Sequence, residues 1–92
     1  MFINKKPHRL GVPTMVRASA HDDGIVLFHT GNGRLFASNR TGARIWQCLE
    51  KGMALDAIAS EVGREYGIAQ AIAREHTANF LMELQRHGLI ET

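Results

Sequence analysis

Histidine and cysteine side chains are the first candidates for chemistry in this sequence, because they bind transition metals and the thiolate is a nucleophile. The chain has five histidines and one cysteine. Metal ligands recur at short helical or loop spacings, whereas His76 and His87 stand eleven residues apart and Cys48 has no second cysteine. Cys48 also adjoins Leu49 in an apolar helical pattern, which predicts a packed thiol. We therefore expect no metal site and no cysteine nucleophile.

Paired carboxylates and glycine-rich loops are two other common sources of catalysis. Two carboxylate pairs occur on predicted helices, Glu61 with Glu65 and Glu75 with Glu83. Both pairs fall on polar helix faces, whereas acid–base chemistry needs burial to tune the pKa values of such groups. The Gly-Asn-Gly segment at 31–33 precedes a strand pattern and not the helix that a phosphate loop requires. The sequence thus predicts no catalytic residue, no cofactor and no enzyme activity.

Length and composition favour one small globular domain. Ninety-two residues suffice for a single core, and 45% apolar with 22% charged residues is ordinary for a soluble protein. No run approaches the roughly 18 apolar residues of a membrane span, and the N-terminal segment lacks the apolar stretch of a signal peptide. A lone cysteine suits a reducing compartment. We expect a cytoplasmic protein with no membrane partner.

Charge is distributed unevenly along the chain. Residues 1–46 carry seven Lys and Arg against two Asp, a net charge of +5, and residues 47–92 carry four against seven acidic residues, a net charge of −3. A basic first half is compatible with a nucleic acid or an acidic peptide as partner, and also with a solvated surface of mixed sign. The acidic half holds the helices that would have to contact DNA, which disfavours a nucleic-acid partner.

The first part of the chain has the alternation and the turn residues of a β-meander. Strand patterns span 14–19, 25–28 and 34–38. Between them lie the turn sequences His-Asp-Asp-Gly at 21–24 and Thr-Gly-Asn-Gly at 30–33. These segments predict three antiparallel strands.

Everything after the third strand has helical spacing. We expect helices over 41–51, 55–66 and 70–87, each followed directly by a glycine that ends it. Asn39 or Thr41 can cap the first of them. The predicted fold is α+β, a three-stranded antiparallel sheet followed by three helices, close in shape to a winged helix-turn-helix.

We assign residues 14–92 to this domain and residues 1–13 to a flexible N-terminal arm. A three-stranded sheet has free edges, and such an edge can pair with an extended peptide. The apolar side of the last helix could wall a groove beside the third strand, although the same spacing favours plain core packing for any single residue on it. A winged-helix DNA-binding protein and a homodimer that pairs through the same edge remain the other hypotheses.

Several segments together resemble the PqqD-like family of peptide chaperones, the recognition elements for precursors of ribosomally made, post-translationally modified peptides. The similar segments are Thr-Gly-x-Gly with a Leu-Phe strand at 30–36, Asn-x-Thr-Gly-Ala-x-Ile-Trp at 39–46, Leu-Asp-Ala-Ile-Ala at 55–59, Tyr-Gly-Ile at 66–68 and Phe-Leu-x-Glu-Leu-x-x-x-Gly-Leu-Ile at 80–90. Their order and spacing carry the resemblance, which covers roughly residues 14–91.

The resemblance implies a leader-peptide recognition domain that binds the N-terminal leader of a precursor peptide. The leader would add as a further strand beside the third strand, in a groove against the third helix. Carried over to this chain, backbone pairing would fall to Leu35, Phe36, Ala37 and Ser38. The groove would be lined by Thr77, Phe80, Leu81 and Leu84, with Arg34, Arg40 and Arg74 placed to meet acidic side chains.

The segment at 39–46 is more similar to stand-alone members of lasso-peptide pathways than to the pyrroloquinoline-quinone chaperone. This likeness implies a separate leader peptidase as partner, with a radical-enzyme peptide modification such as pyrroloquinoline quinone biosynthesis as the alternative setting. The chain departs from the family at His76 and Thr77, where an acidic-apolar pair is more usual.

Overall fold

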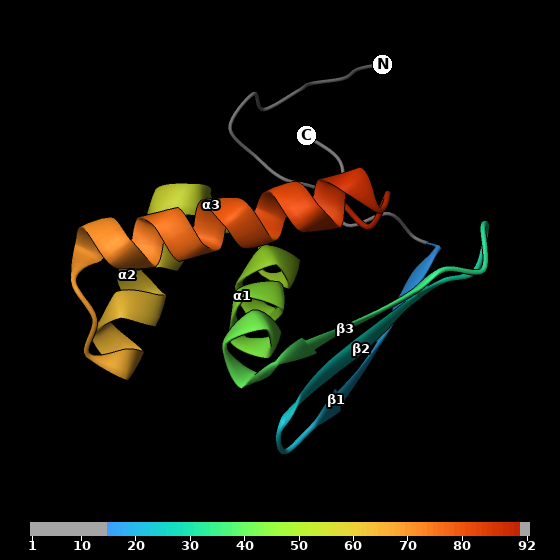
Figure 1. Ribbon diagram of the computed structural model, residues 1–92, viewed down its shortest axis with the longest axis horizontal. Helices are drawn as coiled ribbons and strands as arrows, with labels where there is room; N and C mark the ends of the chain where they lie inside the picture. The colour runs from blue at the N-terminus through green and yellow to red at the C-terminus, as the bar shows by residue number, and fades with distance from the viewer. Residues whose placement is uncertain (1–14, 91–92) are drawn as a thin grey trace.

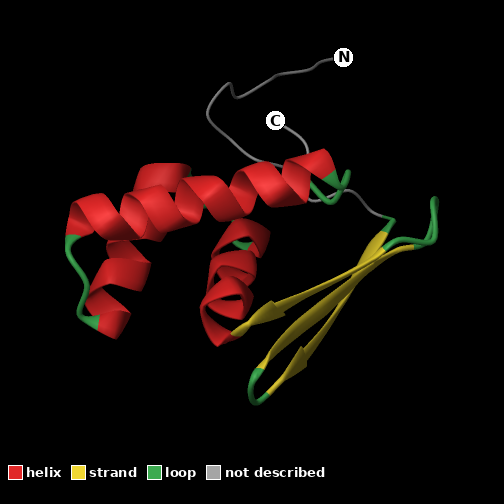
Figure 2. Ribbon diagram, viewed as in Figure 1, coloured by secondary structure: helices red, strands yellow, loops and turns green. Residues whose placement is uncertain are grey.

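The computed structural model describes residues 15–90 and has the predicted order of three strands and three helices (Figures 1 and 2). The strands are β1 (Val16–His21), β2 (Gly24–His29) and β3 (Leu35–Asn39). The helices are α1 (Arg40–Glu50), α2 (Leu55–Tyr66) and α3 (Gln70–Arg86). The predicted α+β fold class is therefore confirmed. The N-terminal arm assigned to residues 1–13 lies outside the described residues.

The sheet is an antiparallel meander in the order β1-β2-β3. β1 and β2 pair through to His21 and Gly24, so the turn contains only Asp22 and Asp23. The sequence predicts that the first strand ends at 19 and that the second begins at 25, because all of 21–24 has the residues of a turn. Cross-strand pairing carries the ladder further than the turn residues suggest.

Helix α1 follows β3 with no intervening loop. Asn39 is its N-cap, and its Oδ1 accepts a hydrogen bond from the Gly42 N–H at 2.9 Å. This settles the choice between Asn39 and Thr41, since Thr41 lies inside the helix. The junction rigidly couples the last strand to the helical part, because one residue ends the strand and caps the helix.

The end of α3 is held against the core by a glycine turn. Gly88 has φ +73° and the Leu89 N–H donates to the Leu84 carbonyl at 2.9 Å, the hydrogen bond of a Schellman-type cap. Leu89 and Ile90 are both buried. The predicted glycine stop with its apolar latch is confirmed.

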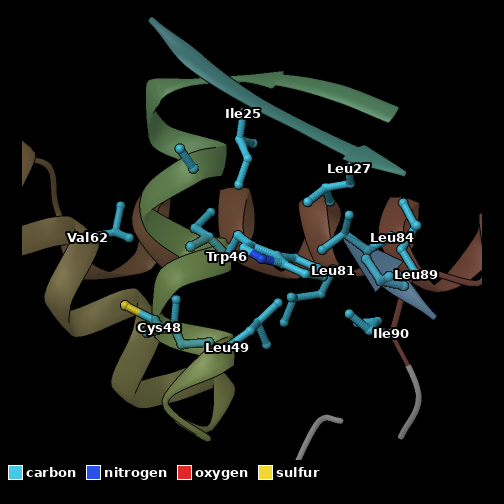
Figure 3. Packing of buried hydrophobic residues seen from close by; sticks show 14 residues of the cluster. Ile25, Leu27, Trp46, Cys48, Leu49, Val62, Leu81, Leu84, Leu89 and Ile90 are labelled. Atoms are coloured by element: carbon cyan, nitrogen blue, oxygen red, sulfur yellow. The ribbon is translucent and has the colours of Figure 1, made fainter. Parts of the chain in front are cut away.

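One apolar core lies between the sheet and the helices. Figure 3 shows Trp46 at its centre, below Ile25 and Leu27 of β2 and beside Leu81 of α3. The Trp46 ring is buried, and its Nε1–H donates to Glu50 Oε2 at 3.0 Å. This hydrogen bond satisfies the one polar atom of the Trp46 side chain, so the ring can be buried without leaving an unpaired N–H.

Cys48 is fully buried in the same core, and its burial raises the pKa of the thiol. A thiol held protonated away from solvent is a poor nucleophile. The prediction that Cys48 packs is confirmed.

An ion-pair cluster on the surface ties α1 to α2. The Arg44 guanidinium contacts Glu61 at 2.8 Å and Glu65 at 2.6 Å, and Arg64 also pairs with Glu61. The polar face expected for these glutamates is thus partly an interhelical contact.

Candidate peptide-binding site

β3 is an edge strand of the described sheet. It pairs with β2 on one side, and no other strand of residues 15–90 pairs with it on the other. Figure 1 shows β3 as the strand that leads directly into α1, and the C-terminal end of α3 approaches the sheet from the side of α1. The open side of β3 is therefore the place where an added strand would pair.

The hydrogen-bond pattern fixes which residues of β3 turn their backbone outward. The His29 N–H donates to the Arg34 carbonyl at 2.9 Å, which marks a hydrogen-bonded position between β2 and β3. Because such positions alternate along an antiparallel pair, Phe36 and Ser38 direct their N–H and C=O groups toward β2. Leu35 and Ala37 direct theirs away from it, to the open side.

The side chains of β3 alternate in the complementary way. Phe36 and Ser38 are half-buried on the face that carries the helices, whereas Leu35 is 68% exposed and Ala37 is exposed on the opposite face. The sequence predicted this alternation but left open which set faces the core. The structure assigns Phe36 and Ser38 to the core face.

On the face of the sheet that carries the helices, the Phe36 ring packs against Phe80 of α3 and against His87, the C-cap residue of α3. Its ring centroid lies 6.0 Å from that of Phe80 and 5.1 Å from that of His87, each at an interplanar angle of 59°. Phe36, Phe80 and His87 are all half-buried. We call the outward backbone of Leu35 and Ala37, together with these three rings, the edge site.

The junction between β3 and α1 packs closely against Phe80, one of the three rings of the edge site. A Cβ on Gly42 would lie 2.1 Å from the Ser38 hydroxyl oxygen and 3.0 Å from the Phe80 ring. Glycine is therefore required for the close approach of these three residues. This contact fixes the Phe80 ring next to the end of β3.

The predicted groove residues of α3 do not share one environment. Phe80 is half-buried, whereas Thr77, Leu81 and Leu84 are at most 7% exposed and pack in the core. Their burial agrees with the core-packing alternative. The Thr77 hydroxyl is buried without a hydrogen-bond partner. The role of these residues in peptide binding stays a prediction.

The predicted arginines are also separated. Arg34 is exposed just before β3, and Arg40 at the start of α1 donates from Nε to the Asp22 carbonyl at 3.2 Å. Arg74 pairs with Asp56 of α2 at 2.7 Å. It therefore lies on the flank of α3 toward α2, about 120° around the helix from Phe80 at 100° per residue. Arg34 and Arg40 are next in sequence to the two ends of β3, but the Arg40 guanidinium lies at the β1–β2 turn and Arg74 lies against α2.

His87 belongs to the edge site although the sequence analysis considered it only as a metal ligand. Its Nδ1 is buried without a hydrogen-bond partner, and its ring packs on Phe36. The spacing offered a signal: Phe80 and His87 are seven residues apart, so they share one side of a helix.

The sequence from residue 24 to residue 90 matches the family model described as coenzyme PQQ synthesis protein D (PqqD). This is more than half of the chain. The chain belongs to the PqqD family. The three-strand, three-helix fold predicted from the family resemblance agrees with this assignment. No curated protein sequence matches the chain.

Two solved structures share the fold of this PqqD-family chain along nearly their whole lengths. TbiB1 in complex with the TbiA(beta) leader peptide superposes with a TM-score of 0.82 at 28% identity, over 88% of this chain and 94% of TbiB1. Lasso peptide synthetase B1 complexed with the leader peptide superposes with a TM-score of 0.80 at 23% identity, over 90% of this chain and 98% of that one.

None of the helices within residues 15–90 has the length and apolar character to cross a bilayer. Within the same residues, no three His, Cys, Asp or Glu side chains gather as metal ligands.

Proposed function

We propose that this chain binds the N-terminal leader of a ribosomally made precursor peptide by strand addition to β3. It then presents the leader to a separate processing enzyme, a leader peptidase of the lasso type, and is not itself an enzyme. The observation that carries the proposal is the outward backbone of Leu35 and Ala37 on an open sheet edge. Membership of the PqqD family and the likeness to two chains solved with leader peptides support it.

Backbone pairing gives the guest peptide an affinity that depends little on its sequence. Each backbone hydrogen bond contributes about 0.5–1.5 kcal/mol net, and a micromolar dissociation constant needs about 8 kcal/mol in total. A few backbone pairs therefore need the help of buried apolar side chains. The edge site offers such a surface in Phe36, Phe80 and His87.

The pleat of β3 determines which guest side chain meets that surface. In an antiparallel guest, the residue opposite Phe36 occupies a non-hydrogen-bonded position, where Cα atoms approach to about 4.5 Å. Its side chain points to the same face as Phe36, toward α3. A large apolar residue at this guest position is the expected anchor.

DNA binding is not favoured by the charges on α3. Arg74 pairs with Asp56 and Arg86 pairs with Glu83, so both of these cations are already balanced by carboxylates. A helix that contacts phosphates needs an uncompensated positive face.

Amide hydrogen exchange tests the proposal directly, with a peptide selected from a displayed library for binding to this chain as the added ligand. The Leu35 and Ala37 amides point away from β2, so they should exchange fast in the free chain and slow when the peptide binds. The Phe36 and Ser38 amides already bond to β2 and should change little. Ala18 and Ala20 on the outer edge of β1 provide the matched control, since their amides also point outward. Equal protection of both edges, or of neither, would contradict strand addition at β3.

A further inference from the structure

The outer face of the sheet, opposite the helices, carries an exposed apolar pair at the proposed binding edge. Leu35 is 68% exposed and Phe28 is 38% exposed. They stand directly opposite each other in the β2–β3 register. This pair is at a non-hydrogen-bonded position, so the two side chains lie close together. The apolar surface therefore reaches the last strand on the side where a guest would pair.

A guest strand cannot pair with β3 without placing a side chain beside Leu35. The N–H and C=O of Leu35 point to the open side. A guest residue that bonds to them lies directly opposite, and its side chain must share the outer face with Leu35. That position lies next in sequence to the anchor opposite Phe36, whose side chain points to the other face.

We propose that Leu35, supported by Phe28, is a second specificity site that accepts a large apolar side chain of the guest on the outer face. This inference rests on the proposed function. It predicts that the guest carries two consecutive large apolar residues, one for each face of the sheet. The rings of Phe36, Phe80 and His87 would contact the guest side chain on the helical face, which we call the inner position. Leu35 would contact the guest side chain on the outer face, which we call the outer position.

The next outward position along β3 serves as an internal comparison. Ala37 lies on the same face and presents its backbone to the same side, but its side chain is a single methyl group opposite Val26. A guest side chain beside Ala37 gains less apolar contact than one beside Leu35. The preference for a large residue should therefore be strong at one outward guest position and weak at the other.

Selection from a displayed library of random peptides tests this inference without knowledge of the natural guest. The full chain and its Leu35→Glu variant are used as baits in parallel. With the wild-type chain, the selected peptides should share two adjacent large apolar positions. With Leu35→Glu, the inner position should stay apolar and the outer position should shift to Lys or Arg.

A double-mutant cycle with one selected peptide measures how much the contact between Leu35 and the outer guest side chain contributes to binding. Alanine at the outer guest position should weaken binding to the wild-type chain about two- to five-fold, the effect of a typical cross-strand pair. The same peptide change should have no effect on binding to Leu35→Ala. Because Leu35 is exposed, both Leu35 variants should keep the wild-type circular dichroism spectrum.

The possible results separate this inference from the proposed function. An unchanged outer position in the Leu35→Glu selection would overturn the second site while leaving strand addition intact. Self-association of the wild-type chain that Leu35→Glu abolishes would also overturn it, since the face would then belong to a second copy. Selected peptides whose affinity survives Ala37→Pro in a folded chain would contradict the proposed function itself.

Discussion

Within residues 15–90, β1 and β3 are both edge strands of the sheet, and each turns alternate backbone groups away from β2. On β1, the Thr30 N–H donates to the Met15 carbonyl at 2.8 Å, so Ala18 and Ala20 face outward by the same alternation that exposes Leu35 and Ala37. The two edges thus offer the same kinds of hydrogen-bonding groups to a guest.

The side chains around the two edges differ. Ala18 and Ala20 point to the helical face but are exposed, whereas Phe36 on the same face of β3 packs against the rings of Phe80 and His87. An edge that offers backbone alone is a weak and unselective template. The comparison teaches that a binding edge is distinguished by the neighbouring apolar surface and not by its unpaired backbone.

The largest expected effect comes from proline substitutions placed on the two edges in turn. Ala37→Pro removes an outward N–H and inserts a ring on the open side, so it should abolish leader binding. Ala18→Pro makes the same change on β1 and should leave affinity unchanged. Fluorescence anisotropy with a labelled leader peptide measures both, and circular dichroism checks that both variants fold. Equal losses in the two variants would remove the distinction between the edges.

The aromatic surface should account for the next largest effect. Phe80→Ala removes a half-buried ring that contacts Phe36, and it should weaken leader binding by roughly 1–3 kcal/mol if the ring contacts the guest. Met82→Ala is the matched control, because Met82 is an apolar residue of α3 that is 62% exposed. Isothermal titration gives the affinities. A loss of helical circular dichroism together with binding would mean that Phe80 acts only through the fold.

The smallest effect should come from removing the charge of Arg34, which is exposed just before β3. Arg34→Ala should weaken binding of an acidic leader by about 0.2–1 kcal/mol, the range of exposed ion pairs. The difference should shrink as salt is raised, because salt screens exposed charges. Arg17→Ala on β1 and Arg74→Ala beside Asp56 are the controls, and neither should change affinity. A larger effect of Arg74→Ala would show that α3 presents its other flank to the guest.

Much of the fold was predictable because its signals are local. The alternation in 34–38, a helix cap at Asn39 or Thr41 and the glycine after each helix depend only on nearby residues. The family resemblance rested on the same local segments, and the PqqD match from residue 24 to residue 90 agrees with it.

The candidate site was predictable only in part. Phe36, Phe80, Leu81 and Leu84 were all placed beside the open edge of β3. The structure leaves Phe36 and Phe80 half-buried and buries Leu81 and Leu84 in the core, and the peptide-binding role of all four stays a prediction. A helical pattern marks a broad apolar face and does not say where the core ends and an open flank begins. His87 was missed as a site residue because it was considered only as a metal ligand, although it lies within the predicted helix 70–87 and seven residues after Phe80.

The sequence by itself determined the strands, the helices and their order, since hydrophobic period and capping chemistry act over a few residues. How far β1 and β2 extend toward their shared turn was decided by cross-strand pairing. Only the tertiary structure decided that Leu35 and Ala37 turn their backbone outward, because this depends on pairing with β2. It also decided that Phe80 and His87 face β3 while Arg74 faces α2. Which groups face a neighbouring element depends on how one element is rotated relative to another, and packing between the elements sets that rotation.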